Sequence, residues 1–168
     1  MSQIKNKKEA ADQKRGQLFS KLLAAIAVAA RENPDPEFNP RLRTAVLKAR
    51  EANVPGDNIE RAIKRSSELK DLQEVIIEAY GPEGLALLIF GITDNKNRTI
   101  AEVRTILNEH GSKIADPGNV LWSFENLDGA WQPKFQQSIS EAGKQKLAKL
   151  VELLEEREDV EKVITNTT

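Results

Sequence analysis

The chain has 168 residues and no Cys, so disulfides, thiol nucleophiles and Cys-ligated metals are excluded. Its length allows one or two domains with a sizeable core, and its 30% charged and 5% aromatic residues are typical of a helical or α/β protein with a polar surface. The net charge of −1 hides an asymmetry, because residues 1–65 carry 14 Lys and Arg against 8 Asp and Glu, whereas residues 66–168 carry 11 against 18. This division indicates that the first part meets a polyanion and that the second part repels it.

Residues 1–33 predict a basic lead-in and a long helix. The apolar residues between Leu18 and Ile26 cluster within about 140° on a helical wheel, which gives an amphipathic stripe. On the basic side, lysines spaced by seven residues line up if the helix starts early. They form either a ridge on a phosphate backbone or a solubilising face, and residues 5–8 are alternatively a disordered arm that orders on its partner. The basic candidates are Lys5, Lys7, Lys8, Lys14, Arg15 and Lys21.

Prolines at positions 34 and 36 end this helix, and two shorter helices follow within residues 39–65. Asn39 can cap the first of them, Asn53 can close it and Pro55 can open the second. Phe38 is expected to fill the bundle core. The basic residues either face nucleic acid or form a solvated surface whose stems cover the core. These candidates are Arg41, Arg43, Lys48, Arg61, Lys64 and Arg65.

The spacing of the apolar residues changes after a polar linker at 67–72. Segments 74–80 and 85–93 predict two strands joined by a turn at 81–84, and the second is apolar enough to be central. The next helix is expected to end at His110 and Gly111, where a lone His is a cap rather than a catalyst. Further strands are predicted at 112–115, 120–124, 131–137 (an edge strand) and 160–165, with a helix capped by Ser140 before the last. Trp122 and Phe124 are expected in the core.

This order of elements predicts an α+β protein with two domains. Residues 1–66 form a basic three-helix domain, and residues 73–168 form a mixed-sheet, ferredoxin-like α/β sandwich.

A polar loop at residues 93–99 leads from the end of the central strand into a helix. Its Asp and Asn side chains can cap the helix, and the N–H groups at a helix start favour an anion. Asn95, Lys96, Asn97 and Arg98 are therefore candidates for contacting a phosphate or ribosomal RNA. The alternative is a structural loop, with capping and an ion pair between Arg98 and Asp94.

Three segments resemble motifs of a known family. Asn39-Pro-Arg-Leu-Arg43 and Asp57-Asn-Ile-Glu-Arg-Ala-Ile-Lys64 resemble the signature of the YebC-type family, and Thr93-Asp-Asn-Lys-Asn-Arg-Thr-Ile-Ala-Glu-Val-Arg104 is similar to its second motif. Members are described as probable transcriptional regulators, and mitochondrial and bacterial relatives as translational activators at the ribosome. The resemblance implies a helical domain and two α/β domains, the third inserted within the second. Here the inserted domain is expected to be missing near residues 125–131.

Features of catalysis are sparse. The chain has one His, no Walker A or GxGxxG pattern and no His/Asp/Glu cluster at ligand spacing, so we expect no enzyme, no cofactor, no metal and no small-molecule substrate. No apolar run approaches the length of a membrane span, and the segment after Met1 lacks the pattern of a signal peptide. We therefore expect no membrane partner and a cytoplasmic location, or an organelle if a targeting segment has been removed.

The residues and the resemblance together favour a nucleic-acid-binding regulator of gene expression. A translation factor associated with ribosomal RNA or the ribosome is the leading hypothesis. One alternative is a transcriptional regulator that binds duplex DNA. The other is a protein–protein interaction module that docks through the acidic second domain or through the edge near residues 131–137.

Overall fold

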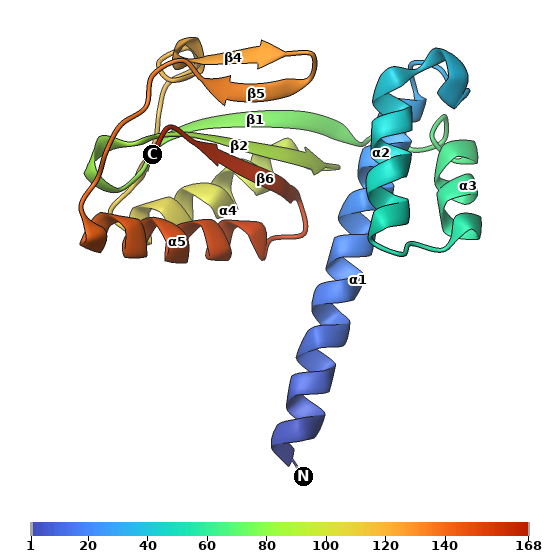
Figure 1. The fold of residues 1–168 in the computed structure, drawn as a ribbon, viewed down its shortest axis with the longest axis horizontal. Helices are drawn as coiled ribbons and strands as arrows, with labels where there is room; N and C mark the ends of the chain where they lie inside the picture. Colours follow the sequence, from blue (N-terminus) through green and yellow to red (C-terminus); the bar gives the residue numbers. More distant parts are fainter. Residues whose placement is uncertain (1, 168) are drawn as a thin grey trace. The chain divides into compact units, whose positions relative to one another are not determined.

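The computed structural model of the protein describes residues 2–167, with side chains from residue 6 onward. The chain divides into two compact units, Met1–Lys70 and Asp71–Thr168, each with its own hydrophobic core (Figure 1). The division falls inside the polar stretch at 67–72 that was expected to be a linker. Among the described residues, no helix combines the length and the apolar character needed to cross a membrane.

The first unit is built on one long helix. α1 (Ser2–Ala30) is followed by the short 3-10 helix η1 (Pro36–Phe38) and by α2 (Pro40–Glu51) and α3 (Gly56–Lys64). The chain reverses between α2 and α3 at Asn53, whose φ of 66° lies in the left-handed region that Asn tolerates. The buried side chains of this unit come from the second half of α1 and from the segments after it: Ile26, Ala29, Ala30, Leu42, Ala49, Val54 and Ile59.

Two expectations for this unit are corrected. α1 begins at Ser2 and runs without a break through Gly16, so residues 5–8 are helical rather than a disordered arm. Phe38 is 70% exposed and lies outside the core, because η1 turns it away from the helices.

The second unit contains a four-stranded sheet in the order β3-β1-β2-β6. β1 (Gln73–Tyr80) and β2 (Ala86–Thr93) are joined by the tight turn η2 (Pro82–Gly84). β3 (Lys113–Ile114) pairs with the free side of β1, and β6 (Val160–Thr165) pairs with β2. The α+β class is confirmed, but the sheet, expected to be mixed, is antiparallel in all three pairings. The reason is that the helical crossover after β2 passes over β1 to reach β3, so the strands it joins are not neighbours.

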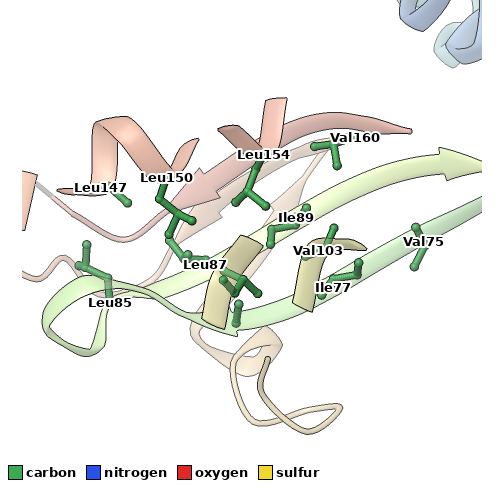
Figure 2. Close-up of a cluster of buried hydrophobic side chains, with 12 residues drawn as sticks. Val75, Ile77, Leu85, Leu87, Ile89, Val103, Leu147, Leu150, Leu154 and Val160 are labelled. Atoms are coloured by element: carbon green, nitrogen blue, oxygen red, sulfur yellow. The ribbon is translucent and has the colours of Figure 1, made fainter. Parts of the chain in front are cut away.

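The two faces of the sheet have different covers (Figure 1). α4 (Lys96–Glu109) and α5 (Glu141–Glu155) pack on one face, and the hairpin of β4 (Phe124–Leu127) and β5 (Ala130–Pro133) lies over the other. Figure 2 shows Leu150 and Leu154 of α5 directed at the sheet. The larger core lies on the helical side and includes Val75, Ile77, Leu87, Ile89, Val103, Leu107, Leu150 and Leu154. The smaller core lies under the hairpin and includes Leu88, Val120 and Phe124.

Residues 120–124 do not form the predicted strand. They form the 3-10 helix η3 (Leu121–Ser123), which runs directly into β4. The cause is Glu78 on β1, whose carboxylate accepts hydrogen bonds from the backbone N–H groups of Gly118, Val120 and Leu121 and so bends the segment. As a result Phe124 is buried as expected, whereas the prediction for Trp122 is wrong, since its side chain is 61% exposed.

Two further boundaries differ from the prediction. α4 begins at Lys96, so the loop predicted at 93–99 shrinks to Asp94 and Asn95, and its last residues form the first helical turn. The helix starts early because the Asn95 side chain accepts a hydrogen bond from the N–H of Arg98 at 3.0 Å. β5 covers 130–133 rather than 131–137, because its partner β4 begins at Phe124, directly after η3, and Phe124 pairs with Pro133.

Candidate nucleic-acid interface

The first half of α1 extends past α2 and α3 without packing on either (Figure 1). From residue 6 to residue 18 every side chain is exposed, and Phe19 is the first to enter the core. A helix segment that is polar all round gains no stability from burial, so this half of α1 has no packing role in the described unit. We name residues 6–18 the overhang.

The overhang carries two rows of basic side chains. Lys7 and Lys14 follow a spacing of seven that continues to the half-buried Lys21. Lys8 and Arg15 form the second row, which is in line with Ile26, a core residue five full turns after Lys8. The row of Lys8 and Arg15 therefore lies on the side of α1 that faces the core further along the helix. The row of Lys7 and Lys14 lies beside it. Lys5, another candidate, has a side chain that lies outside the described residues.

Asn39 fixes how α2 leaves α1. Its side chain is buried and donates hydrogen bonds to the carbonyl oxygens of Ala29 at 2.7 Å and Asn33 at 2.8 Å. Its Oδ1 accepts from the N–H of Leu42 at 3.0 Å, and Pro40 occupies the first helical position. The start of the segment 39–43 therefore has a structural role, and it orients the basic residues on α2.

The basic side chains of α2 are engaged to different degrees. Arg43 donates to the carbonyl oxygens of Pro36 at 2.9 Å and Glu37 at 2.8 Å, so it secures η1. Arg41 lies 3.9 Å from the Glu32 carboxylate, at the long limit of an ion pair. Lys48 is exposed. Exposed ion pairs contribute about 0–1 kcal/mol, so the contact with Glu32 adds little to stability.

α3 presents its basic residues near its C-terminal end. Arg61 and Lys64 are exposed in its last turn, and Arg65 is the C-cap, with Nε 3.7 Å from Glu68. Ile59 and Ile63 on the same helix face the core, so the helix separates an apolar from a basic side.

The remaining candidates lie in the second unit, around the start of α4. Arg98 donates to Asp94 at 2.9 Å and to Asp159 at 3.1 Å, and the same Asp159 oxygen accepts from the Thr99 hydroxyl at 2.9 Å. These hydrogen bonds, first to Asp159 and then to Asp94, raise the pKa of Arg98. The ion pair with Asp94 is the one that the structural interpretation of this loop predicts.

Lys96 and Asn97 are exposed in the first turn of α4. Of the four candidates in this segment, Asn95 caps the helix and Arg98 ties α4 to the turn before β6. Lys96 and Asn97 have no such structural contact among those described for this part of the chain. Sequence reasoning missed Asp159, because a residue 61 positions from Arg98 gives no local signal.

A second feature that the sequence did not reveal is an exposed aromatic pair. The rings of Trp122 and Phe135 lie 6.2 Å apart, and the two side chains are 61% and 60% exposed. The Trp122 indole N–H donates to the carbonyl oxygen of Asn119 at 2.8 Å, which fixes the ring. His110, the lone His, caps α4 and lies 2.8 Å from the Ile106 carbonyl oxygen through Nδ1. The described residues contain no group of three His, Asp or Glu arranged to hold a metal.

Family comparisons cover most of the chain. Residues 1–69 match the model of the TACO1/YebC protein N-terminal domain, and residues 72–129 match that of the TACO1/YebC second and third domain. The chain belongs to the TACO1/YebC family. The family's domain boundary therefore falls at the same place as the division between the two structural units.

Relatives of this family member share sequence with about three quarters of it. A "Probable transcriptional regulatory protein" of Pseudothermotoga lettingae is 56% identical over 126 residues, which are 73% of this chain and 50% of that protein. A protein of the same name from Aquifex aeolicus is 49% identical over 128 residues, 74% of this chain and 51% of that protein. The chain spans about half the length of the curated relatives it matches.

A solved structure extends the likeness further along the chain. The crystal structure of the conserved hypothetical protein Aq1575 from Aquifex aeolicus has a TM-score of 0.84 and 34% identity, and the match covers 94% of this chain and 91% of that one. Since the family models end at residue 129, a match of this extent includes chain beyond them.

Proposed function

We propose that this TACO1/YebC family member is a non-enzymatic regulator of gene expression that binds nucleic acid through its first unit. The observation that carries the proposal is the overhang, a helix segment of exposed side chains that extends past α2 and α3 and bears two rows of basic side chains. Rows of Lys and Arg neutralise phosphates and release counterions, which supplies sequence-independent affinity. The name of the relatives, probable transcriptional regulatory proteins, supports the same general role.

RNA on the ribosome is the proposed target. The family resemblance supports this choice through the relatives that act as translational activators. The exposed candidates of the first unit are Lys and Arg residues. Their contacts to phosphates carry no base specificity by themselves. Such a surface suits a large folded RNA better than a short DNA operator.

Duplex DNA is the second candidate, since the relatives are named as transcriptional regulators. Reading a DNA sequence needs side chains that reach base edges in a groove, such as Asn, Gln or Arg in bidentate contact. Asn6, Gln13 and Arg15 are exposed on the overhang and are the residues that would serve on a helix placed in the major groove.

The acidic second unit repels nucleic acid and so limits its binding to the basic first unit. The proposal also includes the expected loss of the family's third domain. We propose that the β4–β5 turn, at Asp128 and Gly129, stands where longer relatives insert that domain. The support is that the family model ends at residue 129, whereas the structural match covers 94% of the chain. The chain then binds its target through the helical unit and the start of α4.

Sedimentation of the tagged full chain from a cell lysate through a sucrose gradient, at low and high salt, tests the target. We expect co-migration with ribosomal particles at low salt and release at high salt. The variant Arg61→Glu/Lys64→Glu/Arg65→Glu should lose the co-migration. Migration at the top of the gradient at both salt concentrations contradicts the ribosome proposal, and retained co-migration of the variant contradicts the assignment of α3.

A further inference from the structure

The second unit has a groove that the proposed nucleic-acid surface does not use. It lies between α5 and β6, has a volume of about 570 Å³ and is open to solvent. Its floor is apolar and consists of Leu147 and Val151 from α5 and Val163 from β6. Ala148, an exposed residue of α5 with a small side chain, also lines it.

β6 is the last strand in the order of the four-stranded sheet. Directly after it, the Gln137 N–H donates to the Asn166 carbonyl oxygen at 2.8 Å and Gln137 forms an isolated bridge with Thr167, so the edge offered to a partner is that of β6 itself, Val160–Thr165. An edge strand offers backbone groups to an added strand, and edge lysines commonly discourage this. The one lysine in β6, Lys162, has its Nζ 5.0 Å from the centre of the Phe90 ring, and Phe90 packs in the core under the β4–β5 hairpin. The lysine is therefore held on the face opposite the groove.

The two ends of the groove differ in charge. Lys144 lines one end, and Glu152 and Glu155, two and three turns further along α5, line the other. The distance along the helix from Lys144 to Glu155 is about 16 Å, which is the length of about five residues of extended chain. Carboxylates at this end favour a cationic side chain there and repel phosphates, in keeping with the excess of acidic residues in 66–168.

We propose that this groove binds an extended segment of a partner protein in which every second side chain is apolar and a basic side chain follows on the same side. The segment lies beside β6 and adds to the edge of the sheet. Its apolar side chains, which point to one side in an extended chain, fill the groove over Leu147, Val151 and Val163. A basic side chain follows at the end that Glu152 and Glu155 line. This surface is separate from the nucleic-acid surface and gives the acidic unit a protein partner of its own.

Fluorescence anisotropy with the labelled peptide Val-Ser-Val-Ser-Lys (the Val/Lys peptide), added to the full chain, tests the proposal, because its two Val and its Lys point to the same side when it is extended. We expect saturable binding that the same peptide ending in Glu (the Val/Glu peptide) does not show. Ala148→Trp fills the groove and should weaken binding by about tenfold or more. Ala142→Trp is the matched control, since Ala142 is an equally exposed alanine of α5 that does not line the groove, and it should leave binding within about twofold.

A charge swap separates this groove from general attraction to an acidic domain. Glu152→Lys/Glu155→Lys should reverse the preference toward the Val/Glu peptide, whereas Glu156→Lys/Glu158→Lys, with the same change in net charge away from the groove, should not. Equal binding by both double variants, or an Ala148→Trp variant that binds as the native chain does, would overturn the proposal. So would concentration-dependent dimerisation of the chain that Ala148→Trp abolishes, because the occupant is then a second copy.

Discussion

Glu78 is a buried carboxylate whose two oxygens serve one loop. Oε2 accepts from the N–H of Gly118 at 2.7 Å, and Oε1 accepts from Val120 at 3.0 Å and Leu121 at 2.6 Å. A Gln side chain has a single acceptor oxygen and would turn its NH₂ group toward backbone donors. We expect Glu78→Gln to lower the free energy of unfolding by about 1–3 kcal/mol near neutral pH, measured by urea denaturation. Glu125→Gln, at an exposed position of β4, should change it by less than about 0.5 kcal/mol.

The contribution of Glu78 to stability should depend on pH. Burial acts to raise the pKa of Glu78, but the hydrogen bonds from Gly118, Leu121 and Val120 outweigh it, and the pKa lies below its ordinary value of 4.5. A carboxyl whose pKa is lowered by folding makes its full contribution to stability at pH values above its pKa in the unfolded chain. This contribution is lost as the pH falls through its pKa in the folded chain. The stability difference between the native chain and Glu78→Gln should therefore be constant above about pH 5 and shrink below pH 4.5. A difference that grows as pH falls would contradict this role.

Gly91 of β2 has backbone and side-chain atoms of two other segments close to it. A Cβ at this position would be 2.7 Å from the carbonyl oxygen of Asp159 and 3.0 Å from Cγ1 of Val75, beside the irregular register between β2 and β6. Because one of these neighbours is backbone, Gly91→Ala should destabilise the fold by about 1–3 kcal/mol in thermal or urea unfolding. Gly16→Ala, in the middle of α1 with no atom within 4 Å, should instead stabilise the helix by about 0.5–1 kcal/mol.

At the scale of elements, the junction between α1 and α2 depends on Asn39. Asn39→Ala removes two hydrogen bonds to α1 and its exit and one to the start of α2, and should lower the free energy of unfolding by about 1–3 kcal/mol. Asn39→Asp keeps the cap on Leu42 but loses the two donors, so its effect should be close to that of Asn39→Ala. Circular dichroism on heating measures both. If Asn39→Asp were as stable as the native chain, the cap alone would account for the contribution of Asn39, and the two donated hydrogen bonds would not.

The elements that sequence reasoning found are those with strong local signals. The Asn39-Pro40 start, the alternation in 74–80, the apolar run before Thr93 and the leucine seam of α5 all correspond to observed elements. The errors lie where a distant residue decides the local structure. Glu78 bends residues 120–124 from 42 or more positions away, and Asp159 engages Arg98 from 61 positions away.

For the candidate site as well, local spacing predicted some features, and distant contacts decide the others. Spacing alone placed Lys7, Lys14 and Lys21 on one side of a helix, and the structure has a continuous helix through them. Spacing could not indicate that α2 and α3 pack only on the second half of α1, because this depends on tertiary packing. Nor could it indicate that Arg43 and Arg98 are held by carbonyl and carboxylate oxygens.

At the scale of the whole molecule, the charges are separated by unit. The basic residues of the first unit lie on helix surfaces, while the second unit carries an excess of carboxylates, several of them next to one another at the end of α5. This separation limits a polyanion to one unit and leaves the other for a partner of opposite charge. Both proposals made for the protein, nucleic acid on the first unit and a basic peptide on the second, follow from this separation.

The most direct test of the central claim is the affinity of the full chain for a single-stranded RNA, measured by anisotropy over a series of salt concentrations. We predict that log K falls linearly with log salt, and that Lys7→Glu/Lys14→Glu/Lys21→Glu reduces the slope by about 2, since each phosphate contact contributes about 0.7. Lys134→Glu/Lys146→Glu/Lys149→Glu, with the same change in charge on the second unit, should leave the slope unchanged within about 0.5. Equal slopes for the native chain and the α1 variant would contradict the claim that this helix carries the nucleic-acid contacts.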